Sequence, residues 1–155
     1  MINTGPLVAL GRVGALDLVA QLDLEVISPR EVANEIAAGL AAGHSVPMPP
    51  WVSILDLAGS LSSITHALDV GEAAVIQLAL ERGIRDVCID EWRGRRVAKS
   101  AGLRVTGSLG LLGRCKRRGI IQELSPWIER LVAAGARYHP DLLRHFLDTL
   151  GEPKG

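Results

Sequence analysis

The sequence predicts an α/β fold with a central, mostly parallel sheet of four to five short strands, covered by helices on both faces. Short apolar runs alternate along the chain with amphipathic stretches of ten or more residues, as in repeated strand–helix–strand units. Glycine and proline separate these runs and mark the turns between them. No apolar run reaches the roughly 18 residues that a membrane span requires, so an ordinary buried core is expected.

The size and composition favour one domain. The chain has 155 residues, of which 48% are hydrophobic and 22% charged, and we assign 1–150 to a single domain and 151–155 to a polar C-terminal tail. Seventeen basic residues balance seventeen acidic ones, so any nucleic-acid site must be a local patch. Cys88 and Cys115 have no metal-binding spacing and are interpreted as reduced core thiols. With no targeting segment recognised, we expect a cytoplasmic protein that does not associate with membranes.

The first half of the chain is predicted to begin with a very short strand. Met1 and Ile2 form it, and the turn at Asn3–Pro6 opens a helix at Leu7. Ser28 and Pro29 are interpreted as the N-cap and first residue of a later helix that Gly43 ends. The predicted elements are strands at 1–2, 24–27 and 51–57, the last at a sheet edge after a proline-rich loop, and helices at 7–22 with a break near 11–14, at 29–43 and at 69–83.

The second half continues the alternation. Val87, Cys88 and Ile89 form a run typical of a buried strand within 86–90. A second strand is predicted at 103–106, after one intervening helix. The helices are predicted at 91–101, 107–118, 125–134 and 140–150.

Two polar residues end predicted strands. Asn3 follows the first strand and Asp90 follows the Val87–Ile89 run. In open parallel sheets the ligand crevice lies outside the carboxyl ends of the strands, so both side chains are expected at that rim. For Asp90 an alternative is that it only caps the helix that follows.

Glu35 lies on the apolar side of its predicted helix. It belongs to a face with Val32, Ile36, Gly39 and Leu40, whose members recur at spacings of three and four residues. Burying an unpaired carboxylate costs several kcal/mol, so Glu35 should be neutral, paired with a cation or bound to a metal. A lysine or arginine partner, or a position at the edge of the apolar stripe with access to water, would also explain it.

Asp69 and Glu72 have the spacing of a capping box. In that motif Asp69 caps the helix and Glu72 returns a hydrogen bond to the backbone, which we favour for Asp69. For Glu72 the pattern leaves two interpretations open, because a carboxylate in a first helical turn can equally point into the crevice.

Acidic and amide oxygens in such a crevice indicate a hard divalent cation. Mg²⁺ or Mn²⁺ takes oxygen ligands, can activate water for attack on phosphorus, and offsets charge on a phosphate. Crowded carboxylates would also raise each other's pKa in the absence of metal. Basic residues follow Asp90 closely, and we expect Arg95 and Arg96 to hold phosphates. The basic run at 114–118 suits a solvated helix end, and Trp51, Trp92 and Trp127 are interpreted as packing residues.

Several motifs in order resemble one family. The chain is similar to a PIN-like family of small bacterial proteins related to VapC-type toxin ribonucleases, and the similarity runs nearly end to end. The resemblance implies a PIN fold, metal-dependent ribonuclease activity, dimerisation and silencing by a small antitoxin. The motifs are Asn3-Thr4-Gly5-Pro6-Leu7, Pro29-Arg30-Glu31-Val32-Ala33-Asn34-Glu35, Leu68-Asp69-Val70-Gly71-Glu72-Ala73, Ile89-Asp90 through Gly94-Arg95-Arg96-Val97-Ala98, and Thr106-Gly107-Ser108-Leu109-Gly110.

The resemblance also implies a set of site residues. The acidic set of the family falls on Asn3, Glu35, Glu72 and Asp90, which would be both catalytic and metal-binding. Substrate contacts fall on Thr4 and on Ser108, with Thr106 as a further supporting position. The chain departs from the family at Asn3, where active members usually carry aspartate. An amide oxygen still binds a hard cation but removes one negative charge, which weakens metal binding and reduces activity.

Two functions therefore follow from the sequence. The first is a Mg²⁺- or Mn²⁺-dependent endoribonuclease, acting as the toxin of a toxin–antitoxin pair and forming a homodimer. The second is a catalytically weak PIN-like module that binds RNA or a protein partner, and Asn3 is the residue in its favour. Exchange of Asn3 for aspartate discriminates between them.

Overall fold

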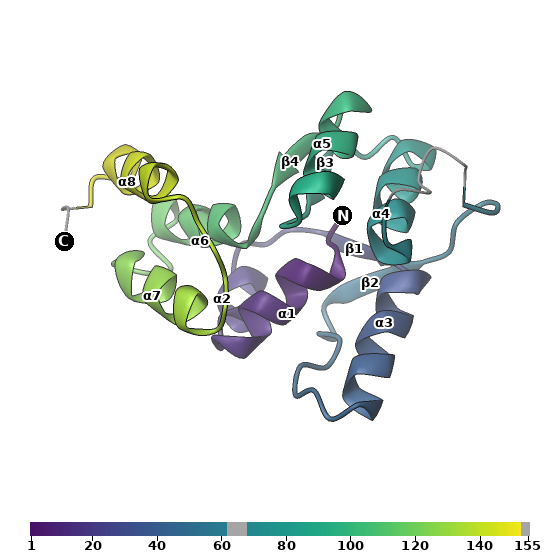
Figure 1. Ribbon diagram of the computed structural model, residues 1–155, viewed down its shortest axis with the longest axis horizontal. Helices are drawn as coiled ribbons and strands as arrows, with labels where there is room; N and C mark the ends of the chain where they lie inside the picture. The colour runs from purple at the N-terminus through teal and green to yellow at the C-terminus, as the bar shows by residue number, and fades with distance from the viewer. Residues whose placement is uncertain (62–67, 153–155) are drawn as a thin grey trace.

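The computed structural model describes residues 1–61 and 68–152, in which short parallel strands lie among helices (Figure 1). This arrangement confirms the predicted α/β class. The strands are β1 (Val26–Pro29), β2 (Val52–Leu55), β3 (Asp86–Cys88) and β4 (Arg104–Thr106). The helices are α1 (Thr4–Arg12), α2 (Leu16–Ala20), α3 (Arg30–Ala41), α4 (Val70–Glu81), α5 (Trp92–Ser100), α6 (Ser108–Arg117), α7 (Ser125–Ala133) and α8 (Pro140–Thr149).

The amino-terminal residues join two pairs of parallel strands. β1 pairs with β2, and β3 pairs with β4. Between them, the Ile2 amide donates to the Ile27 carbonyl at 2.9 Å, and the Asn3 amide donates to the Cys88 carbonyl at 3.0 Å. The predicted first strand is thus a single parallel bridge between Ile2 and Cys88, with β2 at one edge as predicted. This order places Asn3 at the carboxyl end of the middle of the sheet.

The prediction for Ser28 and Pro29 was wrong. Both residues belong to β1, Pro29 is the N-cap of α3, and the helix begins at Arg30. The fully buried Ser28 hydroxyl donates to the Ile2 carbonyl at 2.7 Å instead of capping a helix. Pairing with the amino-terminal segment and β2 extends the strand by two residues, and the extended backbone of Pro29 permits it.

The core lies between the sheet and the helices that cover it. Helix α4 is buried on nearly all sides, with Val75 and Leu78 fully inaccessible, and it contacts both β1 and β3. Cys88 and Cys115 are buried free thiols, as predicted. None of the helices within the described ranges is long and apolar enough to cross a membrane.

Glu152, within the predicted polar tail, is buried and caps α7. Its carboxylate accepts hydrogen bonds from the Leu124 amide and from the amide and hydroxyl of Ser125, at 3.0 and 2.7 Å for the latter two. The Lys116 ammonium lies 3.2 Å away. Burial alone would raise the pKa of Glu152, but the hydrogen bonds from Ser125, Leu124 and Lys116 outweigh it and hold the pKa below its ordinary value. A single carboxylate thereby fixes the end of the chain to the start of α7.

Replacing Glu152 with alanine should destabilise the protein by about 2–3 kcal/mol at pH 7, because buried donors lose a charged acceptor. A lowered pKa contributes stability above the ordinary value of 4.5 that is lost as the pH falls through the folded-state value. Urea unfolding at pH 7 and near pH 3 should therefore show the difference from wild type shrinking in acid. Glu123→Ala, an exposed neighbour, is the control, and an equal effect there would contradict the capping role.

Candidate functional site

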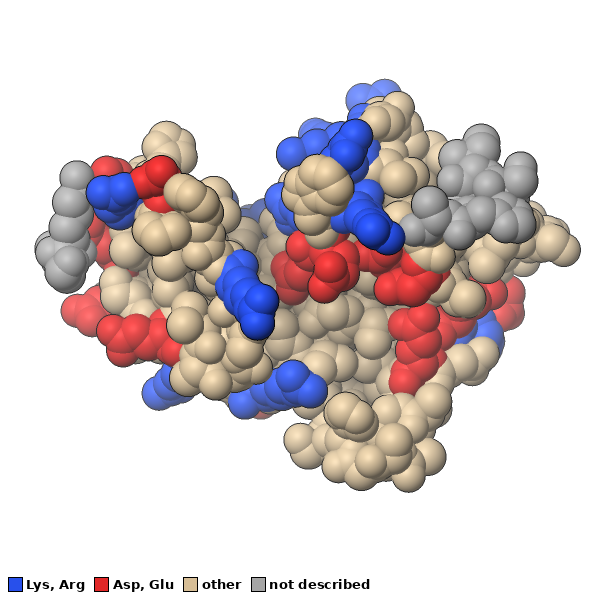
Figure 2. Space-filling view, viewed as in Figure 1, with Lys and Arg blue, Asp and Glu red and all other residues tan. Residues whose placement is uncertain are grey.

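Four predicted site residues lie at the carboxyl ends of the strands. Asn3 comes from the amino-terminal segment, Glu35 from α3, Glu72 from α4, and Asp90 from the turn after β3. Glu35 and Glu72 are close enough for the charge of Glu35 to raise the pKa of Glu72. Asp90 packs against the start of α1, where a Cβ on Gly5 would lie 4.0 Å from its own. Figure 2 shows acidic side chains gathered in the middle of this face.

The Glu35 carboxylate is held by neutral donors. The Thr4 hydroxyl donates to one oxygen, and the Gly71 amide donates to the other at 2.9 Å. Among the described residues no lysine or arginine forms an ion pair with Glu35, so a cation partner does not explain its position. A Cβ at position 71 would lie 2.6 Å from a Glu35 oxygen, so any other residue there would displace the carboxylate from its present position.

Glu72 points into the interior instead of completing a capping box. Asp69 caps α4 by accepting the Glu72 amide at 2.8 Å, as predicted, but the Glu72 side chain does not return a bond to the backbone. It is only 3% exposed, and its Oε1 has no hydrogen-bond partner. Burial, together with the negative charges of Asp69, Glu91 and Glu35, raises the pKa of Glu72 to about 7. The carboxyl group therefore keeps its proton to a higher pH than an ordinary glutamate.

Asn3 also presents a buried oxygen without a donor. Its side chain is 4% exposed, and its Oδ1 has no hydrogen-bond partner. Among the described side chains the only other such oxygen is Glu31 Oε2, for which the structure offers no explanation. A buried acceptor left unpaired costs about 1–3 kcal/mol, so two of them at one sheet edge indicate a missing electropositive partner.

Asp90 caps α6 rather than the helix that follows it. The Ser108 amide donates to Oδ1 at 2.8 Å, and the Ser108 hydroxyl donates to Oδ2 at 2.5 Å. Helix α5 has Glu91 as its N-cap, without a side-chain cap bond. The amino-terminal end of α6 thus holds the carboxylate electrostatically, and Asp90 links the end of β3 to the helix after β4. A Cβ at position 107 would lie 2.5 Å from Asp90 Oδ1, so a side chain there would displace the Asp90 carboxylate from its present position.

Comparison with known families agrees with this geometry. A family model described as a PIN domain matches residues 1–152. The chain belongs to the PIN domain family. No curated protein and no solved structure matches it. PIN domains are generally nucleases that use divalent metal ions, so this chain has a nuclease-type hydrolase fold with its acidic residues at the expected sheet edge.

The basic residues of this PIN domain differ in their contacts. Arg95 donates through Nη1 to the Ile89 carbonyl at 2.7 Å and the Thr106 carbonyl at 3.0 Å, which ties the ends of β3 and β4 together. Arg96 is exposed, and its guanidinium lies over the Trp92 ring, 4.6 Å from the centroid. Arg95 therefore has a structural contact in addition to its predicted role, whereas the charge of Arg96 faces solvent.

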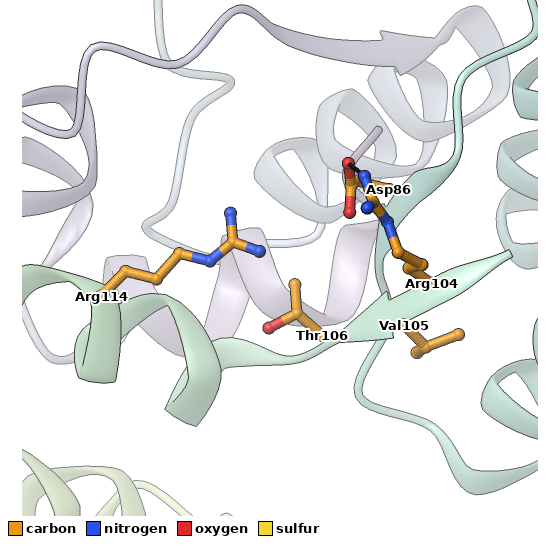
Figure 3. A pocket seen from close by; sticks show the side chains of 5 residues that line it. All are labelled: Asp86, Arg104, Val105, Thr106 and Arg114. Atoms are coloured by element: carbon orange, nitrogen blue, oxygen red, sulfur yellow. Dashed lines mark hydrogen bonds and ion pairs between the residues drawn. The ribbon is translucent and has the colours of Figure 1, made fainter. Parts of the chain in front are cut away.

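A polar pocket lies on the open edge of β4 (Figure 3). It has a volume of about 440 Å³ and is lined by Asp86, Arg104, Val105, Thr106 and Arg114. Arg104 pairs with Asp86 at 2.6 Å, while Arg114 extends from α6 toward them. A second cavity of about 190 Å³ is lined in part by Thr4 and Glu35. Of these two cavities, only the second is lined by a residue of the acidic group.

The donors present suit a hard cation with few protein ligands. Within the part of the chain that the structure describes, no three histidine, cysteine, aspartate or glutamate side chains form a ready-made metal cluster. Asn3 Oδ1 and Glu72 Oε1 nevertheless lack any other partner, and both are oxygens. Mg²⁺ typically takes one or two carboxylates and keeps several waters, which fits this arrangement.

The sequence pattern did not single out two features of the site. Gly71, Gly94 and Gly107 each leave room for a carboxylate that a Cβ would displace, and at position 94 it would lie 2.6 Å from Glu72 Oε1. Tyr138, from the segment between α7 and α8, is half buried, and burial with the charge of Asp90 raises its pKa to about 12. The glycines lie next to predicted site residues in the sequence, and this adjacency could have indicated them. No pattern in the sequence indicated Tyr138.

Proposed function

We propose that this PIN domain is a divalent-metal-dependent endoribonuclease that hydrolyses RNA phosphodiester bonds. The observation that carries the proposal is the pair of buried oxygens without hydrogen-bond donors, Asn3 Oδ1 and Glu72 Oε1, at the same sheet edge as Asp90. Burying such oxygens is unfavourable unless they bind something positive. A hydrogen-bonded structural role would instead have given them donors, as Glu152 has.

The residues divide into ligands and supports. Glu72, Asp90, Glu35 and Asn3 would hold Mg²⁺ or Mn²⁺, and the bound ion would polarise a phosphate oxygen and lower the pKa of water. Glu72 would bind the cation as the carboxylate, so metal binding would release any proton that its raised pKa retains. Three residues position these ligands through hydrogen bonds. Thr4 and Gly71 donate to Glu35, and Ser108 donates to Asp90.

The basic face of α5 supports RNA as the substrate. Figure 2 shows basic side chains gathered at α5, beside the acidic group in the middle of the face. Such an arrangement attracts a phosphate backbone to the acidic site, because cations offset its charge on approach. Arg95 and Arg96, with the hydroxyls of Thr4 and Ser108, would contact the substrate.

We further propose that the protein acts in the cytoplasm as a homodimeric toxin that a small antitoxin silences. The order and spacing of the motifs that resemble VapC-type ribonucleases support this role. A second candidate is a catalytically weak module that binds RNA or protein, which Asn3 favours because the amide lacks the charge of the usual aspartate.

Metal-dependent cleavage of RNA tests the proposal. The purified protein should cleave end-labelled RNA in the presence of Mg²⁺ or Mn²⁺ and should not cleave it in the presence of a chelator. Asp90→Asn should lower the cleavage rate more than about 100-fold. Loss of a residue that only supports a metal ligand already costs 10- to 100-fold, and loss of a ligand should cost more. Asp86→Asn, at the exposed opposite end of β3, is the control and should cleave normally. Undiminished cleavage by Asp90→Asn would refute the site. A wild type that binds RNA but cleaves under no condition would favour the module.

A further inference from the structure

Trp92 is an exposed aromatic residue next to the acidic site. It is the first residue of α5, two positions after Asp90, and 64% of its surface is accessible. Of the two interpretations that the sequence left open, packing in the core or at an interface, the first was therefore wrong. Transfer of an indole ring from water is favourable, so a tryptophan left this exposed beside a site indicates a binding role.

The helix that begins with Trp92 is basic. Helix α5 carries four basic residues, Arg93, Arg95, Arg96 and Lys99, and no acidic one. The Arg96 guanidinium stacks on one face of the indole, 4.6 Å from the ring centroid. The other side chains exposed on this helix are charged or small and polar, so α5 itself gives the ring no apolar neighbours of the kind found in the core of a protein interface. An aromatic ring among cations is instead typical of surfaces that bind single-stranded nucleic acid.

The position of Trp92 on its helix places it beside the site, because it begins α5 directly after Asp90 and Glu91. Helical side chains lean toward the amino-terminal end and cover the turn before their own Cα. We therefore expect the indole to lie on the side of the segment that contains Asp90 and Glu91. A base stacked there would belong to a nucleotide close to the phosphate at Asp90.

We propose that Trp92 is a stacking site for an unpaired RNA base flanking the cleaved bond, with Arg96 holding the ring and contributing charge toward the backbone. The identity of the polymer rests on the proposed function. Stacking on an open ring needs a base that is free of its duplex neighbours, so the site selects single-stranded or looped RNA over duplex.

Binding without cleavage tests the stacking site. In the Asp90→Asn background, the affinity for a short fluorescein-labelled single-stranded RNA should fall about tenfold to a hundredfold on Trp92→Ala and much less on Trp92→Phe. Trp127→Ala is the matched control, since Trp127 also carries an arginine, Arg130, at 4.6 Å but lies on α7. Thermal unfolding of each variant checks that the fold is retained.

An abasic scan identifies the stacked base. RNAs that lack a single base are tested one position at a time. At one position, loss of the base should weaken binding to the Asp90→Asn protein. Loss of the same base should not weaken binding to the protein that also carries Trp92→Ala. Unchanged affinity in Trp92→Ala, or an equal loss with the abasic RNA, would overturn the proposal. If Trp92→Ala dissociates a dimer without changing the RNA affinity, the ring makes a protein contact instead. The proposal would also be overturned if neither the Asp90→Asn protein nor its Trp92→Ala derivative binds RNA.

The binding and cleavage readouts separate this proposal from the function on which it rests. Trp92-dependent binding with no cleavage by wild type would leave the stacking site in place and refute the nuclease. If Trp92→Ala still cleaves RNA with unchanged KM and unchanged preference for single strands, the nuclease proposal stands and the stacking site is refuted.

Discussion

Replacing Glu72 with glutamine should abolish metal-dependent cleavage and at the same time stabilise the metal-free protein. Glutamine has nearly the same shape but cannot supply a negative oxygen to a divalent cation, so the rate should fall more than about 100-fold. The stabilisation follows from the buried and crowded carboxyl group, whose pKa is raised to about 7. A change that improves the fold while removing activity is the signature of a site residue.

The pH dependence of this effect has a definite sign. A pKa of about 7 in the folded state against the ordinary 4.5 means that the unfolded chain loses the Glu72 proton first as the pH rises. Glu72 therefore lowers the stability of wild type progressively between about pH 4.5 and 7, by up to roughly 3 kcal/mol above that range. Glu72→Gln has no proton to lose, so its advantage should grow over this window and then level off.

Urea unfolding in chelator at pH 4.5, 6 and 8, for wild type and Glu72→Gln, measures the effect directly. Glu129→Gln, an exposed carboxylate on α7, is the control and should change stability little at any pH. Added Mn²⁺ should stabilise wild type more than Glu72→Gln, since a ligand that binds only the native state raises its stability. A variant less stable than wild type at pH 8 would show that the Glu72 carboxylate is satisfied, and the site assignment would fail.

Replacing Asn3 with aspartate should have the opposite effect on the metal-bound and metal-free protein. The new carboxylate adds a charge to the ligand set, so Mn²⁺ affinity should rise about tenfold or more and cleavage should increase with it. Without metal the same charge is buried at a position that is only 4% exposed, and stability should fall by roughly 2 kcal/mol.

Asn3→Ala should change the Mn²⁺ affinity in the opposite direction. It removes the side-chain oxygen and should therefore weaken Mn²⁺ binding. Calorimetric titration with Mn²⁺, RNA cleavage and unfolding in chelator would be measured for all three proteins. Tighter metal binding without cleavage would favour the binding module. Unchanged metal affinity in both variants would remove Asn3 from the ligand set.

Local sequence signals predicted most of the elements. Gly43 and Gly83 follow the ends of helices and have positive φ, as expected for residues that have no Cβ. Asp69 caps α4 by accepting a hydrogen bond from the Glu72 amide, three residues further on. The buried-type run before Asp90 indicated β3, and the parallel-sheet rule then placed Asn3 and Asp90 at one edge. These predictions succeeded because each depends on residues within a turn or two of the chain, or on a rule common to all open parallel sheets.

The tertiary structure decided the partners of the polar side chains. Asp90 caps α6 through Ser108, 18 residues further on, although the nearer helix α5 was an equally plausible choice from sequence. Glu72 has a capping-box position, yet packing against Gly94 of α5 turns it into the interior. Both outcomes depend on which helix lies across the sheet edge, and the spacing of residues in one helix contains no information about that.

The same reason explains the residues that the pattern misplaced. Ser28 became a strand residue because the amino-terminal segment offers the Ile2 carbonyl, and Trp92 is exposed because none of the elements that the structure describes buries the start of α5. The sequence by itself determined the fold class, the order of elements and the sheet edge that bears the acidic residues. The fold alone determined which of those oxygens remain without a donor, because hydrogen bonds to side chains form between segments that are distant in the chain.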